Sequence, residues 1–167
     1  MPRWNRKKAY TALVRPHISP MFRAAWRWTR DRQTAEDLVQ DVLVKLVDRV
    51  EEMQRIDRLR PWLLRIVYRR FVDHYRRESR SPIDPAAALE TATGGDDPLE
   101  LTDRQQRLTA GLSGLNPDQR DVILMHDVEG YTAAEVAEIL QISVGTVKSR
   151  LHRGRRLLKK FLEEGTF

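Results

Sequence analysis

The segment from Tyr131 to Phe161, YTAAEVAEILQISVGTVKSRLHRGRRLLKKF, predicts two short helices joined by a tight turn. Thr132 and Glu135 have the spacing of a capping box, in which a hydroxyl and a carboxylate each satisfy a free amide at a helix start. The apolar pattern breaks at Gln141, and Ser143 can cap a second helix. We therefore expect a helix-turn-helix in this part of the chain.

The second helix of this motif combines one apolar stripe with a basic surface. The stripe repeats at alternating spacings of four and three and consists of Val147, Leu151, Gly154, Leu158 and Phe161. The side chains left for the exposed face are Thr146, Lys148, Ser149, Arg150, His152, Arg153, Arg155, Arg156, Lys159 and Lys160. Such a helix suits a DNA major groove, where Arg and Lys reach guanine edges and phosphates. The alternative is a basic amphipathic helix whose polar face is simply solvated.

Charge is distributed unevenly along the 167 residues, which could form one or two small domains. The net charge is +6, and basic residues outnumber acidic ones in residues 1–80. Residues 81–101 are rich in Pro, Gly, Ala and acids and contain no Lys or Arg, as expected of a flexible linker. We predict domains at 1–80 and 102–167, joined by this acidic linker, and a polyanionic partner for both.

Several classes of function are disfavoured. The chain has no cysteine, so disulfides, thiolate metal sites and cysteine nucleophiles are excluded. Its four histidines are scattered, and we find no metal-ligand spacing, phosphate-binding loop or nucleophile–base pair. We therefore expect no catalytic residues, no metal and no cofactor, and we do not expect an enzyme. No signal-peptide core follows the basic N-terminus and no apolar run approaches a membrane span, so we expect a cytoplasmic protein without membrane insertion.

The first part of the N-terminal half predicts a frayed basic arm and three helical segments. A short helix over 9–15 should end or kink at Pro16, and Ser19 with Pro20 should start the next one. Thr34 and Asp37 predict a capped amphipathic helix that runs to Val50. The polar side of that helix carries Asp37, Gln40 and Asp41. The acids of this polar side either complement the helix dipole or, together with Gln40, form a docking surface for a basic partner, and the residues alone leave both interpretations open.

A loop is predicted at 51–59, followed by an arginine-rich helix that starts at Pro61 and runs to Glu78. Its surface should carry Arg65, Arg69, Arg70, Asp73, His74, Arg76 and Arg77, with Tyr68 and Tyr75 as candidate stacking rings. Aromatic rings among arginines suit single-stranded nucleic acid, because rings stack on bases while guanidinium groups hold phosphates. The alternative is an ordinary core under a solvated basic face.

Further along the chain, Thr102 with Gln105 and Asn116 with Pro117 predict two more helix starts, the second helix ending at Gly130. No segment alternates with the period of a strand. The predicted fold class is therefore all-α, with two small helical domains, the C-terminal one a helix-turn-helix.

Taken together, the two halves resemble the extracytoplasmic-function (ECF, group 4) sigma factors of the sigma-70 family. AEDLVQD at 35–41 resembles the family's region 2.2, and RPWLLRI at 60–66 with the helix after it resembles regions 2.3 to 2.4. The stretch from LNPDQRD at 115–121 through SVGTVKSRLHRGRRLL at 143–158 resembles regions 4.1 and 4.2. This pair of motifs, in this order across a linker, is much more specific than a helix-turn-helix alone.

The resemblance implies a protein that binds core RNA polymerase, positions it at a promoter and opens the duplex. Asp37, Gln40 and Asp41 match positions that face the clamp helices of the polymerase's largest subunit in relatives, and the second domain would contact the flap. The arginine-rich helix, with Arg65, Tyr68, Arg69, Arg70, Asp73, His74, Arg76 and Arg77, would capture the minus-ten strand. The minus-thirty-five element would be read by Thr146, Lys148, Ser149, Arg150, His152, Arg153 and Arg156. An anti-sigma factor is a further expected partner.

Some positions depart from the family pattern. Arg69 stands where relatives commonly carry asparagine, so the base preference of the minus-ten helix does not transfer. Gln141 stands where a glycine is common, and Gly154 replaces a usual alanine. The competing function is a stand-alone helix-turn-helix transcriptional regulator with an N-terminal sensing or dimerisation domain, although a basic, arginine-rich first half suits nucleic acid better than a small ligand.

Overall fold

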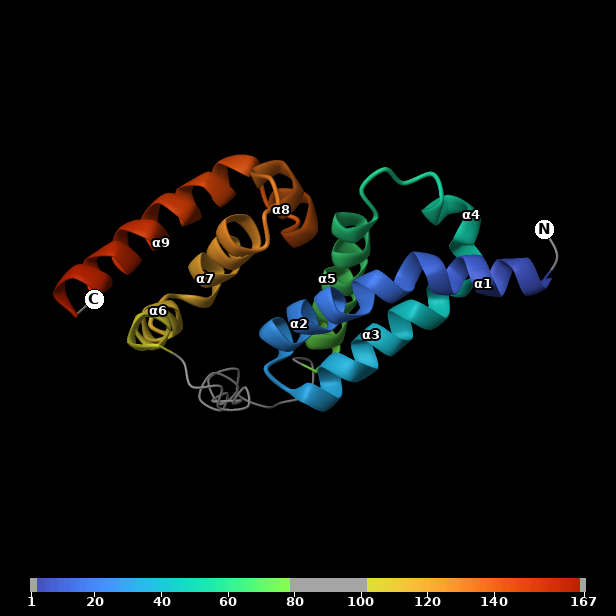
Figure 1. Cartoon of the computed structure of the whole chain (residues 1–167), viewed down its shortest axis with the longest axis horizontal. Helices are drawn as coiled ribbons and strands as arrows, with labels where there is room; N and C mark the ends of the chain where they lie inside the picture. The colour runs from blue at the N-terminus through green and yellow to red at the C-terminus, as the bar shows by residue number, and fades with distance from the viewer. Residues whose placement is uncertain (1–2, 79–101, 166–167) are drawn as a thin grey trace. The chain divides into compact units, whose positions relative to one another are not determined.

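A computed structural model describes residues 3–78 and 102–165, and these residues form helices and connecting turns without a strand. The chain divides into two compact units, Met1–Gly94 and Gly95–Phe167, which are described separately below (Figure 1). The predicted all-α class and the C-terminal helix-turn-helix are confirmed. The predicted linker at 81–101 lies outside the described residues.

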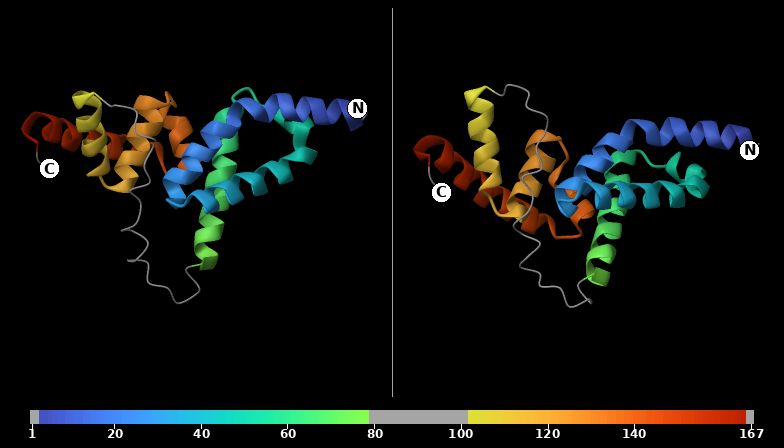
Figure 2. Two further views of the ribbon diagram at one scale, coloured as in Figure 1. Left: turned by 60° about the horizontal axis from the view of Figure 1, so that its bottom comes forward. Right: turned by 90° about the horizontal axis from the view of Figure 1, so that it is seen from below.

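The N-terminal unit is built around the helices α2 (Ile18–Thr29), α3 (Arg32–Leu46) and α5 (Leu59–Glu78). Helix α5 crosses both α2 and α3 (Figure 2), and these three helices share one buried core. The fully buried side chains of this core include Met21, Ala25, Val42, Leu46, Leu63, Leu64 and Val67. The two alanines of α2, Ala24 and Ala25, leave room for the close approach of its neighbours. The basic end of α5 is thereby held on a well-packed scaffold.

The beginning of the chain differs from the prediction. Helix α1 spans Arg3–Val14, so the basic arm is helical and not frayed. A 3₁₀ turn, η1 (Arg15–His17), contains Pro16 and leads directly into α2, as expected for a proline that interrupts a helix. Ser19 is not an N-cap, because α2 already begins at Ile18 and no side chain caps it. The 3₁₀ turn supplies carbonyls to the first amides of α2, which removes the need for a capping hydroxyl.

The start of α3 was also predicted too late. Asp31, not Thr34, is the N-cap, and its Oδ2 accepts hydrogen bonds from the Thr34 amide at 2.7 Å and the Thr34 hydroxyl at 2.6 Å. Arg30 adopts a left-handed conformation with φ 55°, which ends α2 and turns the chain toward Asp31. Helix α3 ends at Leu46 and not at Val50, because a 3₁₀ turn, η2 (Val47–Arg49), follows it. The segment predicted as a loop at 51–59 is partly helical, since α4 (Val50–Met53) overlaps it.

The C-terminal unit consists of α6 (Asp103–Ser113), α7 (Pro117–Ile123), the π-helical turn η4 (Leu124–Val128), α8 (Ala133–Leu140) and α9 (Val144–Glu164). All caps predicted for the C-terminal unit are present: capping boxes at Thr102 and Thr132, and N-caps at Asn116 and Ser143. Helix α9 packs against α6, α7 and α8. Its buried residues meet the core of the unit, which includes Val122, Met125, Val136, Ile139 and Val147.

Two backbone features shape the helix-turn-helix. Gln141 ends α8 in the left-handed conformation, with φ 55°, which costs a non-glycine residue about 1 kcal/mol. Gly154 lies where α9 crosses α7: a Cβ there would lie 2.7 Å from Ile123 Cδ1 and 3.2 Å from Gln119 Cβ. The departure from alanine at Gly154 is therefore explained by close packing between these two helices.

Candidate nucleic-acid and polymerase interfaces

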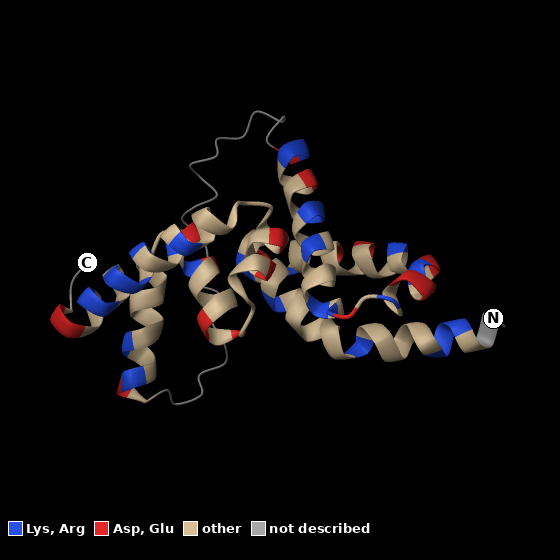
Figure 3. Ribbon diagram, turned by 90° about the horizontal axis from the view of Figure 1, so that it is seen from above, with Lys and Arg blue, Asp and Glu red and all other residues tan. Residues whose placement is uncertain are grey.

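Helix α9 presents most of the predicted minus-thirty-five residues to solvent. The Ser143 hydroxyl accepts a hydrogen bond from the Thr146 amide at 3.0 Å and so fixes where the helix starts. Lys148, Ser149, His152, Arg153 and Arg156 are exposed, whereas Thr146 and Arg150 are half-buried. Figure 3 shows the lysines and arginines along α9. The structure therefore brings five of the seven predicted residues onto an accessible face.

Arg150 is engaged within the protein. Its Nη2 lies 2.6 Å from Asp118 Oδ2, and only 24% of its side chain is exposed. Asp118 belongs to the first turn of α7, where an acid also favours the helix dipole. A DNA contact by Arg150 stays a prediction, and the guanidinium group in this structure connects α9 to α7.

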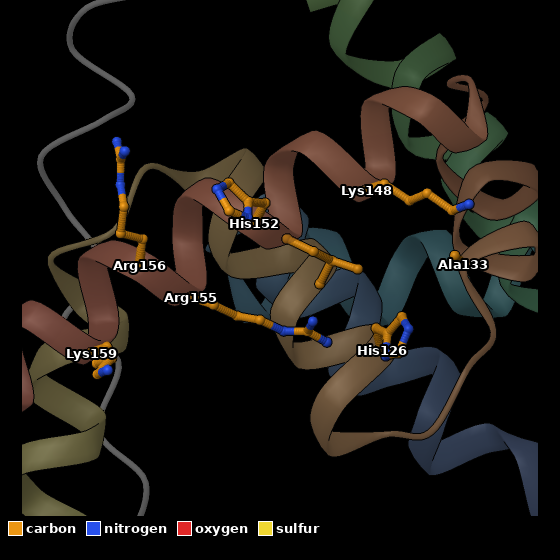
Figure 4. Close-up of a pocket in the computed structure, with 8 residues that line it drawn as sticks. His126, Ala133, Lys148, His152, Arg155, Arg156 and Lys159 are labelled. Atoms are coloured by element: carbon orange, nitrogen blue, oxygen red, sulfur yellow. The ribbon is translucent and has the colours of Figure 1, made fainter.

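A basic groove of about 510 Å³ lies beside the recognition helix (Figure 4). Its lining comes from the turn η4, the start of α8 and the side of α9: His126, Ala133, Lys148, Leu151, His152, Arg155, Arg156 and Lys159. Three of its polar lining residues, His126, Arg155 and Lys159, were not among the predicted site residues. Arg155 and Lys159 were expected on the exposed face of α9, but nothing in the sequence placed His126 beside them.

The π-helical turn explains the position of His126. Sequence periodicity predicts a continuous α-helix from Pro117 to Glu129, but the helix widens at Leu124, and the amide of Glu129 bonds the Leu124 carbonyl at 2.9 Å. Such widened turns occur frequently at functional sites. As a result His126 and the adjacent Asp127 lie against α9.

Asp127 lies beside this groove and contacts two of its lining residues, Arg155 and His126. Arg155 donates two hydrogen bonds to it, with Nε 2.9 Å from Oδ2, and the Nδ1 atom of His126 lies 3.1 Å from Oδ1. The hydrogen bonds from Arg155 hold the pKa of Asp127 below its ordinary value of 3.8, and the charges of Arg155 and His126 act in the same direction. Arg155 is thus paired with Asp127, and Lys159 Nζ lies 3.8 Å from Glu163 Oε1. Lys148 and Arg156 add two exposed cations to the groove for an anionic ligand.

Helix α5 carries the second predicted nucleic-acid surface. Arg69, Asp73, Arg76 and Arg77 are exposed, and Arg65, Tyr68, Arg70 and His74 are half-buried. His74 Nε2 lies 3.3 Å from Glu78 Oε1, one turn further along the helix. All eight predicted residues therefore lie on a helix whose basic end is open to solvent.

A row of aromatic rings runs along this helix. Trp28 of α2 meets Tyr68 edge-on with ring centroids 5.0 Å apart, and it stacks on Phe71 at 6.2 Å. Phe71 in turn contacts Tyr75 at 6.3 Å, and Tyr75 is 47% exposed. Tyr68 therefore belongs to a packed cluster and Tyr75 is the more exposed ring, while stacking on a base stays a prediction.

The predicted docking residues Asp37, Gln40 and Asp41 are all exposed on α3. Asp37 accepts a hydrogen bond from Gln33 at 3.1 Å, within the same helix. Asp41 is different, because Oδ2 accepts two hydrogen bonds from Arg70 of α5, one from Nη2 at 2.5 Å and one from Nε at 3.2 Å. These bonds hold the pKa of Asp41 below its ordinary value of 3.8. The structure thus joins two residues that the sequence assigned to different partners.

An apolar groove, not anticipated from the sequence, continues the same side of α3. It is lined mainly by Tyr10, Val14, Ile18, Leu43, Val44 and Val47. Val44 is 72% exposed, and it lies one helical turn beyond Gln40, so the two share a face. Exposed apolar side chains beside polar ones are typical of a protein-binding surface.

Arg49 anchors the beginning of α5. Its guanidinium makes two hydrogen bonds of 2.6 Å to the carboxylate of Glu52 and stacks over the Trp62 ring, 4.9 Å from the centroid. This contact ties η2 and α4 to the first turn of α5.

In the described ranges 3–78 and 102–165, no cluster of His, Asp and Glu could hold a metal ion, and none of the helices there is long and apolar enough to cross a membrane.

Both units match known protein families. Residues 13–81 match the model for Sigma-70 region 2, and residues 105–158 match Sigma-70, region 4. The ECF RNA polymerase sigma factor SigL of Mycobacterium tuberculosis is 32% identical over 161 residues, covering 92% of this chain and 88% of SigL. SigE of Mycolicibacterium smegmatis, also an ECF RNA polymerase sigma factor, is 31% identical; the match covers 97% of this chain but only 62% of SigE.

Among solved structures, the sigma factor RpoE of Bartonella quintana, in complex with the anti-sigma factor NepR, matches with a TM-score of 0.72. Its sequence identity is 25%, over 94% of this chain and 98% of that one. The structural match and the sequence matches thus agree over both units. The chain belongs to the family of ECF RNA polymerase sigma factors.

Proposed function

We propose that this sigma factor directs core RNA polymerase to specific promoters, where α5 captures the melted minus-ten strand and α9 reads the minus-thirty-five duplex. The observation that carries the proposal is the presence of two different nucleic-acid surfaces, one in each sigma-70 region: arginines around an exposed ring on α5, and a basic recognition helix on α9. A stand-alone regulator is disfavoured, because the N-terminal unit matches region 2 and not a sensing domain.

At the minus-thirty-five element, base edges would be read by the exposed residues of α9. Lys148 and Arg153 can reach guanine acceptors, and Ser149 and His152 lie between them on the same helix. The basic groove beside α9 would hold the phosphate backbone through Lys148, Arg156 and Lys159. Arg150 would act through Asp118 by fixing α9 on α7.

At the minus-ten element, Tyr75 would stack on an unpaired base while Arg69, Arg76 and Arg77 hold the strand's phosphates. Tyr68 and Phe71 would support Tyr75 from below through their ring contacts. Arg65, Arg70, Asp73 and His74 complete the predicted surface of this helix.

Core polymerase would dock on α3. Asp37, Gln40 and Asp41 would face basic residues of the clamp helices of the largest subunit, and the apolar groove around Val44 would bury its exposed side chains in the same contact. The C-terminal unit would contact the flap. We further propose that the chain is a group 4, cytoplasmic factor that has no catalytic activity of its own, and that an anti-sigma factor holds it inactive, as NepR binds the Bartonella relative.

The test is in vitro transcription with core polymerase on a fragmented genomic library. We expect transcripts that start downstream of a shared two-part promoter and that are lost in a Lys148→Ala/Arg153→Ala variant. Lys160→Ala is the matched control, because it removes one exposed positive charge from the same helix outside the predicted contact set. Specific duplex binding by the free chain without any polymerase-dependent transcript would overturn the proposal in favour of a conventional regulator.

A further inference from the structure

Asp41 and Arg70 connect the two surfaces of the N-terminal unit, and this contact carries a further inference that rests on the proposed function. Asp41 lies on the docking face of α3, and Arg70 lies on the strand-binding helix α5, 29 positions later. The acid is 51% exposed and the arginine 24% exposed. A partner can therefore reach Asp41 without unfolding the unit, whereas most of the Arg70 side chain is covered by the protein.

Both hydrogen bonds from Arg70 end on the same oxygen of Asp41, Oδ2. Asp41 and its neighbour Gln40 are both exposed on α3. A basic side chain of a docking protein can therefore approach the carboxylate and compete for its charge. Any such approach weakens the hydrogen bonds between Arg70 and Asp41, because one carboxylate then interacts with two cations.

We propose that Asp41 is a positioning residue for strand capture: it neutralises Arg70 in the free chain, and docking of core polymerase on Asp41 releases Arg70 to a phosphate of the minus-ten strand. The contact makes the strand affinity of α5 depend on polymerase binding. The chemistry needs no large movement, since Arg70 only exchanges one oxyanion for another.

The experiment measures the Kd of a fluorescent, mixed-sequence 12-nucleotide single-stranded DNA by anisotropy, for the full free chain and for the chain bound to core polymerase, with core alone as the blank. In the free chain, Asp41→Asn should tighten binding about two- to fivefold, the range of an exposed ion pair. Arg70→Ala should have little effect on the free wild-type chain, and it should abolish the gain in the Asp41→Asn background.

Glu36→Gln is the matched control for Asp41→Asn. It removes one acid from the same helix and frees one arginine, Arg32, which lies on α3 and not on α5. Its effect on the Kd should stay below about 1.5-fold, because exposed charges that lie apart are screened by salt. Equal Kd changes for Asp41→Asn and Glu36→Gln would overturn the proposal.

The polymerase-bound arm tests the release itself. Arg70→Ala should now weaken strand binding about two- to fivefold, although it is nearly silent in the free chain. Arg69→Ala, which removes an exposed arginine next to it, should cost the same with and without polymerase. An Arg70→Ala effect of the same size in both arms contradicts the proposal. Failure of the proposed function would look different, because the wild-type chain would then neither bind core polymerase nor support transcription.

Discussion

Helices α5 and α9 are both rich in arginine, yet they use it differently. In α9 two arginines are held by acids of the scaffold that supports the recognition helix, Arg150 by Asp118 and Arg155 by Asp127. In α5 Arg70 is held by Asp41, an acid that lies on another predicted binding face. The internal pairs of α9 therefore fix one surface, whereas the pair of α5 connects two. The number of arginines on a helix thus overstates the number available to DNA.

The surroundings of the two helices differ as well. The basic residues of α5 lie among rings from Trp28 to Tyr75, and those of α9 lie over aliphatic residues and Gly154. Rings suit a melted strand, since every base has a face on which they stack. A helix that packs closely on its own domain and carries its cations on the outer face fits an intact major groove. The following predictions test this contrast.

The largest effects should come from the exposed cations of α9. Lys148→Ala and Arg153→Ala should each weaken binding of the holoenzyme to a minus-thirty-five duplex by about 1–3 kcal/mol where a bidentate base contact is lost. Arg150→Ala should mainly lower the stability of the C-terminal unit, and Asp118→Asn should reproduce that loss. Anisotropy and thermal melting separate the two outcomes. If Arg150→Ala weakens DNA binding without lowering the melting temperature, Arg150 is a direct contact.

Tyr75 should give the next largest effect, on strand binding alone. Tyr75→Ala should weaken binding of a minus-ten single strand by the holoenzyme by about 1–2 kcal/mol, because a stacked base loses its platform. Tyr75→Phe is the control, since it keeps the ring. Binding to a minus-thirty-five duplex should be unchanged in both variants. Equal strand affinities for the Ala and Phe variants would show that the ring does not stack.

Gly154→Ala should destabilise the C-terminal unit by about 1 kcal/mol. The added methyl group gains about 0.5–1 kcal/mol of helix propensity but must displace Ile123 and Gln119, which costs more in a packed contact. Gly145→Ala is the control in the same helix, where a Cβ meets only Ser143 Oγ at 3.8 Å, and it should stabilise slightly. Urea unfolding measures the free energy of unfolding of both variants. A stabilised Gly154→Ala variant would mean that α7 and α9 tolerate a wider separation.

The smallest predicted effect is on acid stability. Because the pKa of Asp127 is lower in the folded chain than its ordinary 3.8, its ion pair stabilises the fold above about pH 4. That contribution, about 0.5 kcal/mol for a partly exposed pair, is lost as the pH falls through the folded pKa. Asp127→Asn should therefore lower the melting temperature at pH 7, and its difference from the wild type should shrink as the pH falls below about 4. A difference that stays constant as the pH falls would place its cause outside this carboxylate.

Local features of the fold could be predicted from the sequence, because each depends on a few adjacent residues. The capping boxes at Thr102 and Thr132 and the left-handed Gly130 follow from residue type and spacing. The start of α2 could not be predicted from Ser19 and Pro20, because the preceding 3₁₀ turn already serves its first amides. The first helix was predicted too short, from residue 9 and not from Arg3, since its basic first turns gain stability only by packing on later elements.

The candidate site was predictable in its residue types but not in its pairings. The exposed face of α9 follows from its apolar stripe, and the structure leaves most of that face open. The partners of Arg70, Arg150 and Arg155 lie 28 or more positions away in sequence, where periodicity carries no information. Nor does periodicity reveal a π-helical turn, because its residues are ordinary helix formers.

The turn at Leu124–Val128 also constrains which insertions and deletions this chain tolerates. A π-helical turn accommodates about one residue more than an α-helical turn of similar pitch. Removing one residue between Leu124 and Val128 would convert this turn into an α-helical one without rotating the residues after it. The same deletion in α7 would rotate every following residue by about 100° around the helix axis, which would carry His126 and Asp127 away from α9 and Tyr131 out of its buried position. The loss of one residue within the turn therefore disturbs the C-terminal unit less than the same loss in α7.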